Sequence, residues 1–181
     1  TGTEVVAVPG RHVPPAILRP LIRAARTQRR VEVDYVSLNQ PDREGRIIVP
    51  HTLVWTGLRW HVRAWCEKNQ DYRDFVLSRF RGEPELMDHS AHSVDQDGEW
   101  QTHLTLEIAP DPRLTAQQQA VVAHDYGMSD QRWTLSVRAK LLPYLLRLIQ
   151  LDPQAEANAP RAQQIVIVNR DELQPWLFRD A

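Results

Sequence analysis

The repeat of apolar residues changes abruptly near residue 31, and this change limits the possible folds more than any other feature of the chain. Residues 14–30 repeat at three- and four-residue steps, which is typical of an amphipathic helix that begins at two prolines. From Val31 to Ser37 apolar and polar residues alternate, as in a strand. The sequence therefore predicts a helix that leads directly into a β-sheet.

Further short strands follow this first one. We predict them at 46–50, 59–66 and 72–80, separated by the turn-rich segment 39–45 and by a break at Thr56-Gly57. A small, strongly bent barrel would close such a sheet and remove its exposed edges. The expected fold of this part is therefore a small β-barrel with a preceding helix.

The rest of the chain has a different pattern, and we place the domain boundary in the polar stretch 83–99. Alternation is expected to give strands at 100–108, 132–139 and 164–168, with helices at 112–125 and 141–151. Strands separated by helices indicate an α+β domain with one sheet face covered. The predicted organisation is a linker segment and helix at 1–28, a barrel at 29–88 and an α+β domain at 98–181.

Positive charge gathers in the first half of the chain. Residues 1–82 carry 14 Lys and Arg against 8 Asp and Glu, whereas residues 83–181 carry 8 against 15. Thirteen of those 14 are arginines, whose planar guanidinium groups suit phosphate or carboxylate ligands. A solvated charged face is the alternative. The same alternatives hold for Arg19, Arg23, Arg26 and Arg30, which share one helix face and either lie in solvent or contact a nucleic-acid backbone.

Several classes of protein are disfavoured. With 42% apolar and 25% charged residues the chain is typical of a globular protein, and no apolar run reaches the roughly 18 residues of a membrane span. The start lacks the features of a signal peptide, so we expect a cytoplasmic protein. Cys66 is the only cysteine, His89 and His92 have no third ligand at a recognisable interval, and phosphate-binding loops and serine elbows are absent. We therefore expect no metal, no cofactor and no enzymatic activity.

Four blocks carry a more specific signal. They are Tyr35-x-Ser37, Ile48-Val49-Pro50-His51, the run RWHVRA at 59–64 and the run RDFVLSR at 73–79. In this order and spacing they resemble the WYL domain of bacterial transcriptional regulators. The triplet that names the family reads Trp60-His61-Val62 here, a form similar to the subgroup found beside phage-defence systems. The flanking regions resemble the linker helix and the C-terminal extension often called WCX.

The resemblance implies a fold and a role. It implies an SH3-like barrel followed by an α+β, ferredoxin-like C-terminal domain, in a homodimer that senses a ligand. Such regulators usually carry an N-terminal winged helix-turn-helix, which is not readable in this chain. We therefore expect a fragment that would contact operator DNA only through a missing N-terminal domain.

The resemblance also implies a ligand site. The residues that match the polar positions of the family are Tyr35, Ser37, His51, Arg63, Arg73, Ser78 and Arg79. Arginine forks, hydroxyl groups and aromatic faces would suit a nucleotide, another phosphate-bearing signal or a single-stranded nucleic acid. We expect Ser78 and Arg79 at a strand end, because strand alternation would otherwise place them on opposite faces.

Each of these residues also has a structural interpretation. Tyr35 could lie in the core, as expected for Trp60 and Phe75, and Arg63 could form a cross-strand ion pair with Asp74. A homodimerisation scaffold without a ligand is thus the alternative function. An enzyme such as a nuclease ranks third, since the sequence supplies no recognisable general base or metal ligands.

Overall fold

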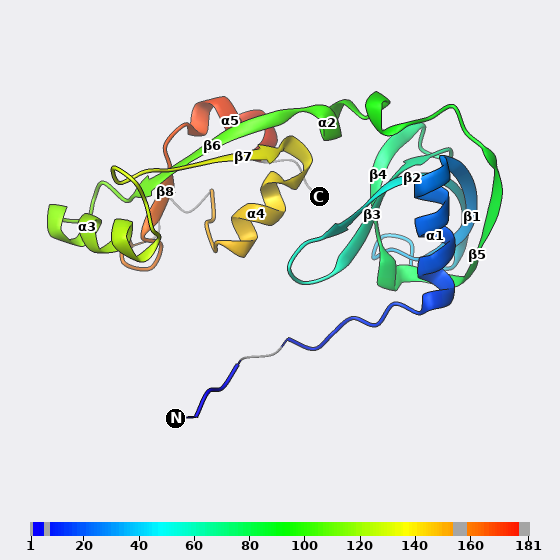
Figure 1. Cartoon of the computed structure of the whole chain (residues 1–181), viewed down its shortest axis with the longest axis horizontal. Coiled ribbons are helices and arrows are strands. Elements are labelled where there is room, and N and C mark those ends of the chain that lie inside the picture. Colours follow the sequence, from blue (N-terminus) through cyan, green and yellow to red (C-terminus); the bar gives the residue numbers. More distant parts are fainter. Residues whose placement is uncertain (1, 6–7, 154–158, 178–181) are drawn as a thin grey trace. The chain divides into compact units, whose positions relative to one another are not determined.

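The computed structural model describes residues 2–5, 8–153 and 159–177 (Figure 1). The chain divides into two compact units, Thr1–Asp97 and Gly98–Ala181. The first unit consists of a helix and a five-stranded sheet, and the second contains a three-stranded sheet with helices. None of the described helices is long and apolar enough to cross a membrane.

Helix α1 (Pro15–Thr27) opens the first unit, close to the predicted range. Pro14 and Pro15 lie at its start, where a missing N–H costs nothing, and the Pro14 carbonyl accepts hydrogen bonds from the first turn. A third proline, Pro20, lies inside the helix. The helix ends at Gln28, which has a left-handed backbone (φ 51°) and donates its N–H to the Ala24 carbonyl. Arg30 therefore lies in the following strand and not on the helix face where we expected it.

Five antiparallel strands follow in the order β4-β3-β2-β1-β5. Their bounds are β1 (Arg29–Tyr35), β2 (Glu44–Trp55), β3 (Trp60–Cys66), β4 (Asp71–Val76) and β5 (Phe80–His89). A 3₁₀ turn, η1 (Leu77–Arg79), joins β4 to β5. In this pairing β4 and β5 are the two edges, so the described strands form an open antiparallel sheet, and the closed barrel is not confirmed.

Strand β5 lies largely inside the stretch 83–99 in which we placed the domain boundary, and the two units divide near the end of that stretch, after Asp97. The strand pairs with β1 through two register irregularities. Most of its side chains are exposed, and only Phe80 and Pro84 are buried. The alternation of apolar and polar residues that identified the other strands is therefore missing here.

The core of the first unit lies between α1 and one face of the sheet. Its fully buried members include Leu21, Ala24, Val31, Ile48, Val62, Ala64, Cys66 and Leu77. Because strand side chains alternate, Val62, Ala64 and Cys66 of β3 point into this core. His61, Arg63 and Trp65 therefore lie on the opposite face, which we call the outer face of the sheet. Trp60 was expected in the core, but it is not buried: 43% of it is exposed at the β2–β3 turn.

The second unit alternates strands and helices, as predicted. Its elements are α2 (Gly98–Gln101), β6 (His103–Pro110), α3 (Ala116–Asp125), β7 (Trp133–Arg138), η3 (Ala139–Leu141), α4 (Leu142–Leu148), β8 (Ile165–Ile167) and α5 (Arg170–Leu177). The described strands form one antiparallel sheet in the order β7-β6-β8, and a ferredoxin-like arrangement is not confirmed. Trp100 belongs to α2 and not to the expected strand, while α5 was not predicted. The core includes Leu106, Ile108, Leu142, Ile165 and Leu173.

Candidate functional site

Arg63 lies on the outer face of β3 and is held by a carboxylate. Only 1% of its surface is exposed, and the same is true of Asp97. Nε and Nη2 of Arg63 donate to Oδ2 and Oδ1 of Asp97 at 2.7 and 3.0 Å. Asp74, its cross-strand neighbour, lies 3.4 Å from Nη1, which is the ion pair anticipated as the structural alternative. The predicted ligand donor is thus engaged by the protein's own acids.

His51 belongs to the same group. An irregularity of β2 between Pro50 and Thr52 displaces it from the regular register. Its Nε2 lies 3.2 Å from Oδ2 of Asp97, and its Nδ1 lies 2.8 Å from the Thr52 hydroxyl. One carboxylate therefore contacts two of the seven predicted residues, Arg63 and His51.

Asp97 ends a segment that is fastened to the outer face, and we call residues 90–97 the strap. The strap contains the short 3₁₀ helix η2 (Val94–Gln96). The Tyr72 hydroxyl donates to the Ser93 carbonyl at 2.7 Å, and burial raises the pKa of Tyr72. The His92 ring stacks on Trp65 with a centroid distance of 4.1 Å. A hydroxyl, a ring and a guanidinium of the sheet thus bind one short segment.

A second group lies at the end of β1 and in η1. Four predicted residues meet here: Tyr35, Ser37, Ser78 and Arg79. The Val36 N–H donates to the Arg79 carbonyl at 3.2 Å, which ties the end of β1 to the turn. Because β4 ends at Val76, Ser78 and Arg79 lie beyond the strand end, as the parity argument expected.

Not all members of this second group are available to a ligand. Tyr35 is buried between Phe75 and Phe80, and its hydroxyl accepts a hydrogen bond from the Val76 N–H at 3.0 Å. The Ser37 hydroxyl accepts from the Gln40 N–H at 3.0 Å within a loop. Tyr35 thus follows its structural interpretation, whereas Ser78 and Arg79 remain partly exposed.

The charges of three arginines, Arg79 among them, act on one buried histidine. His61 is only 3% exposed, and its Nε2 accepts a hydrogen bond from Arg59 Nε at 2.8 Å. Burial first, and then the charges of Arg59, Arg79 and Arg11, lower the pKa of His61 to about 4. We call Arg11, Arg59 and Arg79 around His61 the arginine cluster. In the described part of the chain, neither Arg11 nor Arg79 lies within ion-pair distance of a carboxylate.

The sequence contained a signal for this cluster. Arg59 and His61 both lie in the RWHVRA block, and His61 is the departure from the Trp-Tyr-Leu triplet. Neither was among the predicted site residues. A histidine replacing an aromatic residue in a buried strand, beside arginines, is the pattern that could have pointed to them.

Arg73 belongs to neither group. It is exposed on the edge strand β4 and pairs directly with Ala64. Directly paired residues lie on the same side of a sheet, so Arg73 is on the α1 side and Arg63 is on the other. The structure therefore does not bring these two predicted residues together.

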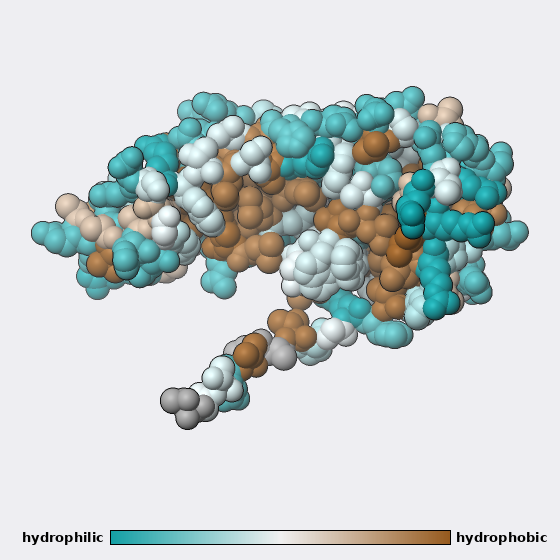
Figure 2. Space-filling model, viewed as in Figure 1, coloured by the Kyte–Doolittle hydropathy of each residue, from teal (hydrophilic) through white to brown (hydrophobic). Residues whose placement is uncertain are grey.

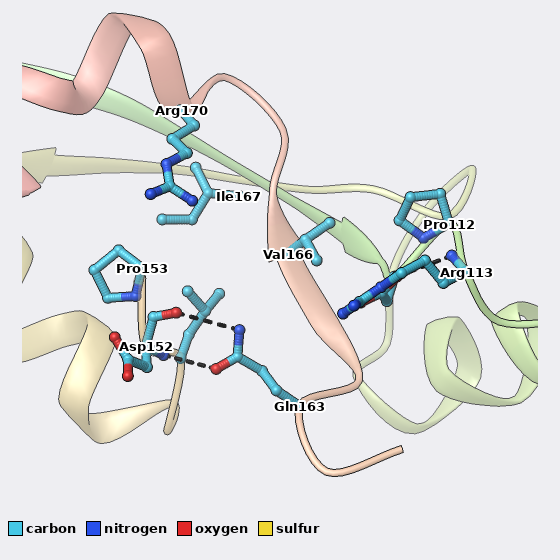
Figure 3. A pocket seen from close by; sticks show the side chains of 10 residues that line it. Pro112, Arg113, Asp152, Pro153, Gln163, Val166, Ile167 and Arg170 are labelled. Atoms are coloured by element: carbon cyan, nitrogen blue, oxygen red, sulfur yellow. Dashed lines mark hydrogen bonds and ion pairs between the residues drawn. The ribbon is translucent and has the colours of Figure 1, made fainter. Parts of the chain in front are cut away.

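A cavity of about 330 Å³ lies in the second unit, among residues 111–113, residues 151–153 and β8 (Figure 3). Figure 3 shows Arg113 and Arg170 on opposite sides of it. Arg113 binds the buried Asp111 and lowers the pKa of that carboxyl, and Gln163 forms two hydrogen bonds with the backbone of Asp152. No residue of the predicted site lines this cavity.

Among the described residues, no cluster of three or more His, Cys, Asp or Glu could hold a metal ion.

Two family models match the chain. The WYL domain model matches residues 16–82, from α1 into β5. Residues 16–82 are therefore a WYL domain. The second model, described as the C-terminal dimerization domain of the BrxR transcriptional regulator, matches residues 103–173. The blocks that carried the resemblance thus identified the WYL domain correctly.

Curated relatives match along nearly the whole WYL-domain chain. A protein of Stenotrophomonas maltophilia named "DNA-binding transcriptional repressor CapW" is 36% identical over 182 residues, which is 98% of this chain. Proteins of the same name from Escherichia coli (strain KTE188) and Pseudomonas aeruginosa are 34% identical over 94% of the chain. The chain spans about 60% of the length of these relatives. Among solved structures, proteasome accessory factor B/C of Arthrobacter aurescens has 19% sequence identity and a TM-score of 0.37. The match covers 93% of this chain and 27% of the chain of that protein.

Proposed function

We propose that this chain is the ligand-sensing and dimerisation region of a bacterial transcriptional regulator of the phage-defence-associated WYL subgroup. The match to a dimerization domain and the name shared by the CapW relatives support a regulatory dimer. In this proposal the region is a homodimer in the cytoplasm, is not an enzyme, and recognises the sequence of operator DNA only through a further N-terminal domain. An anionic ligand, either phosphate-bearing or a nucleic acid, binds to the first unit.

The observation that carries the ligand proposal is the arginine cluster. Its arginines come from the N-terminal segment, the β2–β3 turn and η1. Arg59 donates to the buried His61, and the charges of all three arginines help to keep this histidine neutral at pH 7. Because His61 is neutral, it adds no positive charge to that of the three arginines. Guanidinium groups bind phosphate through paired, charge-assisted hydrogen bonds. The cluster therefore suits a phosphate group.

The proposal assigns different roles to the seven predicted residues. Arg79 and Ser78 contribute directly to the ligand site, with Ser37 at the same end of the sheet. Arg63 and His51 hold the strap through Asp97, and Tyr35 supports the core. Arg73 lies on the other side of the sheet and makes no ligand contact in this proposal.

The finer fold assignments belong to the same proposal. The strand order of the first unit, with its edge strands β4 and β5 joined by the single turn η1, supports an SH3-like fold at 29–88 after the linker helix. For the second unit, at 98–181, a relation to ferredoxin-like domains is proposed from the sequence alone.

The test is a titration with labelled single-stranded oligonucleotides and cyclic nucleotides at two salt concentrations. We expect Arg79→Ala to weaken binding at least about tenfold, because a hydrogen bond to a charged group contributes about 1.5–3 kcal/mol. Arg73→Ala is the matched control, since it removes the same charge from the same unit and should change the affinity less than about twofold. Equal losses in both variants, or no binding by the wild type, would refute the ligand site.

The second candidate function is a homodimerisation scaffold without a ligand. The carboxylates that already engage Arg63 favour it, because this residue then serves structure alone. Sedimentation of the whole chain with and without each anion separates the two functions. A dimer that no anion affects in stability or association supports the scaffold.

A further inference from the structure

Helix α1 carries a stripe of arginines on its solvent-exposed side. We call Arg19, Arg23 and Arg26 the α1 stripe; all three are exposed. They lie at positions i, i+4 and i+7, which places them on one face of the helix. Together with Ile22, which is 37% exposed, and Thr27 they line a shallow hollow of about 360 Å³. Figure 2 shows a strongly hydrophilic column over α1.

The stripe is not neutralised by the described part of the chain. None of its three arginines forms an ion pair there. Arg30, the second residue of β1, is held by Glu67 at 2.6 Å and by Asp88 at 2.8 Å. Arg46 is likewise paired, with Glu44 at 2.9 Å. In the described part of the chain, the three charges of the stripe therefore lie on one exposed helix face without a carboxylate partner.

This arrangement is unfavourable for the isolated helix. Like charges at i, i+3 and i, i+4 repel each other, and α1 has no acidic residue in its first turn to complement the helix dipole. Where a sequence breaks such local rules without internal compensation, a functional contact is the expected reason. The compensating group must be negatively charged and extended along the helix.

We propose that the α1 stripe binds the phosphodiester backbone of duplex DNA. From Arg19 to Arg26 the helix advances about 10 Å, the axial length over which one strand of a duplex presents about three phosphates. Three guanidinium groups at this spacing match three phosphates. Such contacts position a protein on DNA without reading its sequence. A protein partner fits less well, because the hollow offers Ile22 alone as an apolar anchor.

The stripe is independent of the arginine cluster. Helix α1 covers the core side of the sheet, whereas strand alternation places His61 on the outer face. Loss of Arg79 should therefore leave duplex binding unchanged, and the two proposals can fail separately.

The test measures how the affinity for a labelled mixed-sequence duplex of about 20 base pairs depends on salt, between about 50 and 200 mM. The variants are Arg19→Gln/Arg23→Gln/Arg26→Gln and a control of equal charge change, Arg132→Gln/Arg147→Gln/Arg161→Gln, whose arginines are exposed in the second unit. The slope of log K against log salt should fall by about 2–3 in the stripe variant and by less than about 1 in the control. Circular dichroism verifies that both variants keep their helices.

Three results would overturn the proposal. They are an equal change of slope in the two variants, the absence of duplex binding by the wild type at low salt, and binding of a single strand of the same length but not of the duplex. A slope that falls in the stripe variant alone supports it.

Discussion

The buried contact between Arg63 and Asp97 makes a strong prediction about stability. Asp97→Asn keeps the shape of the side chain but removes the charge that balances the guanidinium. Removing one partner of a buried pair costs about 3–5 kcal/mol, because the other charge stays buried without compensation. Asp74 remains 3.4 Å from Arg63 with 17% of its side chain exposed, so it compensates in part. We therefore expect the lower end, about 3 kcal/mol, which is more than a hundredfold in the folding equilibrium.

Hydrogen exchange followed by mass spectrometry suits this prediction, because it resolves each unit of the chain. The amides of β3 and of the strap should exchange at least about a hundredfold faster in Asp97→Asn, and those of β6 should be unaffected. The control is Asp88→Asn, which removes a carboxylate that is 72% exposed and should leave the exchange of β3 and of the strap nearly unchanged. The reasoning is refuted if the two variants exchange alike.

Three further predictions concern single residues. The pKa of His61 is about 4 in the folded state against 6.5 for a freely solvated histidine side chain, so the unfolded state binds the proton more readily. This difference in pKa corresponds to about 3 kcal/mol of the free energy of unfolding, at about 1.4 kcal/mol per pKa unit. That stability should be fully present above pH 6.5 and should be lost as the pH falls toward 4. Urea unfolding of the wild type and of His61→Gln tests this, and parallel pH profiles contradict it. Thr115→Ala should cost about 1 kcal/mol in the second unit, because the Thr115 hydroxyl caps α3 by accepting from the Gln118 N–H at 3.3 Å. Leu106→Ala should cost about 2–5 kcal/mol, since Leu106 is fully buried; a smaller thermal shift than that of Thr115→Ala would contradict it.

Regular periodicity predicted much of the fold. The helix before Val31 and the alternating strand after it appear close to the expected ranges, since each buries one side of a repeating pattern. Strand β5 escaped prediction because an edge strand with exposed side chains leaves no such pattern. The helix predicted at 141–151 contains Pro143, which lies in the first turn of α4, where proline is tolerated.

The candidate site was harder to predict than the fold. Block matching supplied the residue types, and it included Arg79, which we place in the proposed ligand site. It could not show that Asp97, 34 positions after Arg63, would return to the same face of the sheet. A contact between distant residues leaves no local pattern in a polar stretch, and the roles of Arg63 and His51 depend on that contact. Burial likewise decided the role of Tyr35.

The strap also determines how much of the chain is needed for an independent first unit. The family match ends at residue 82 and the expected barrel at 88, but both limits omit the strap. A protein truncated at either point would keep Asp74 alone beside Arg63, leave the Tyr72 hydroxyl without its acceptor and expose the indole of Trp65 to water. The shortest stretch that completes this sheet therefore extends to Asp97, and an expression fragment designed on the motif alone would be prone to aggregate.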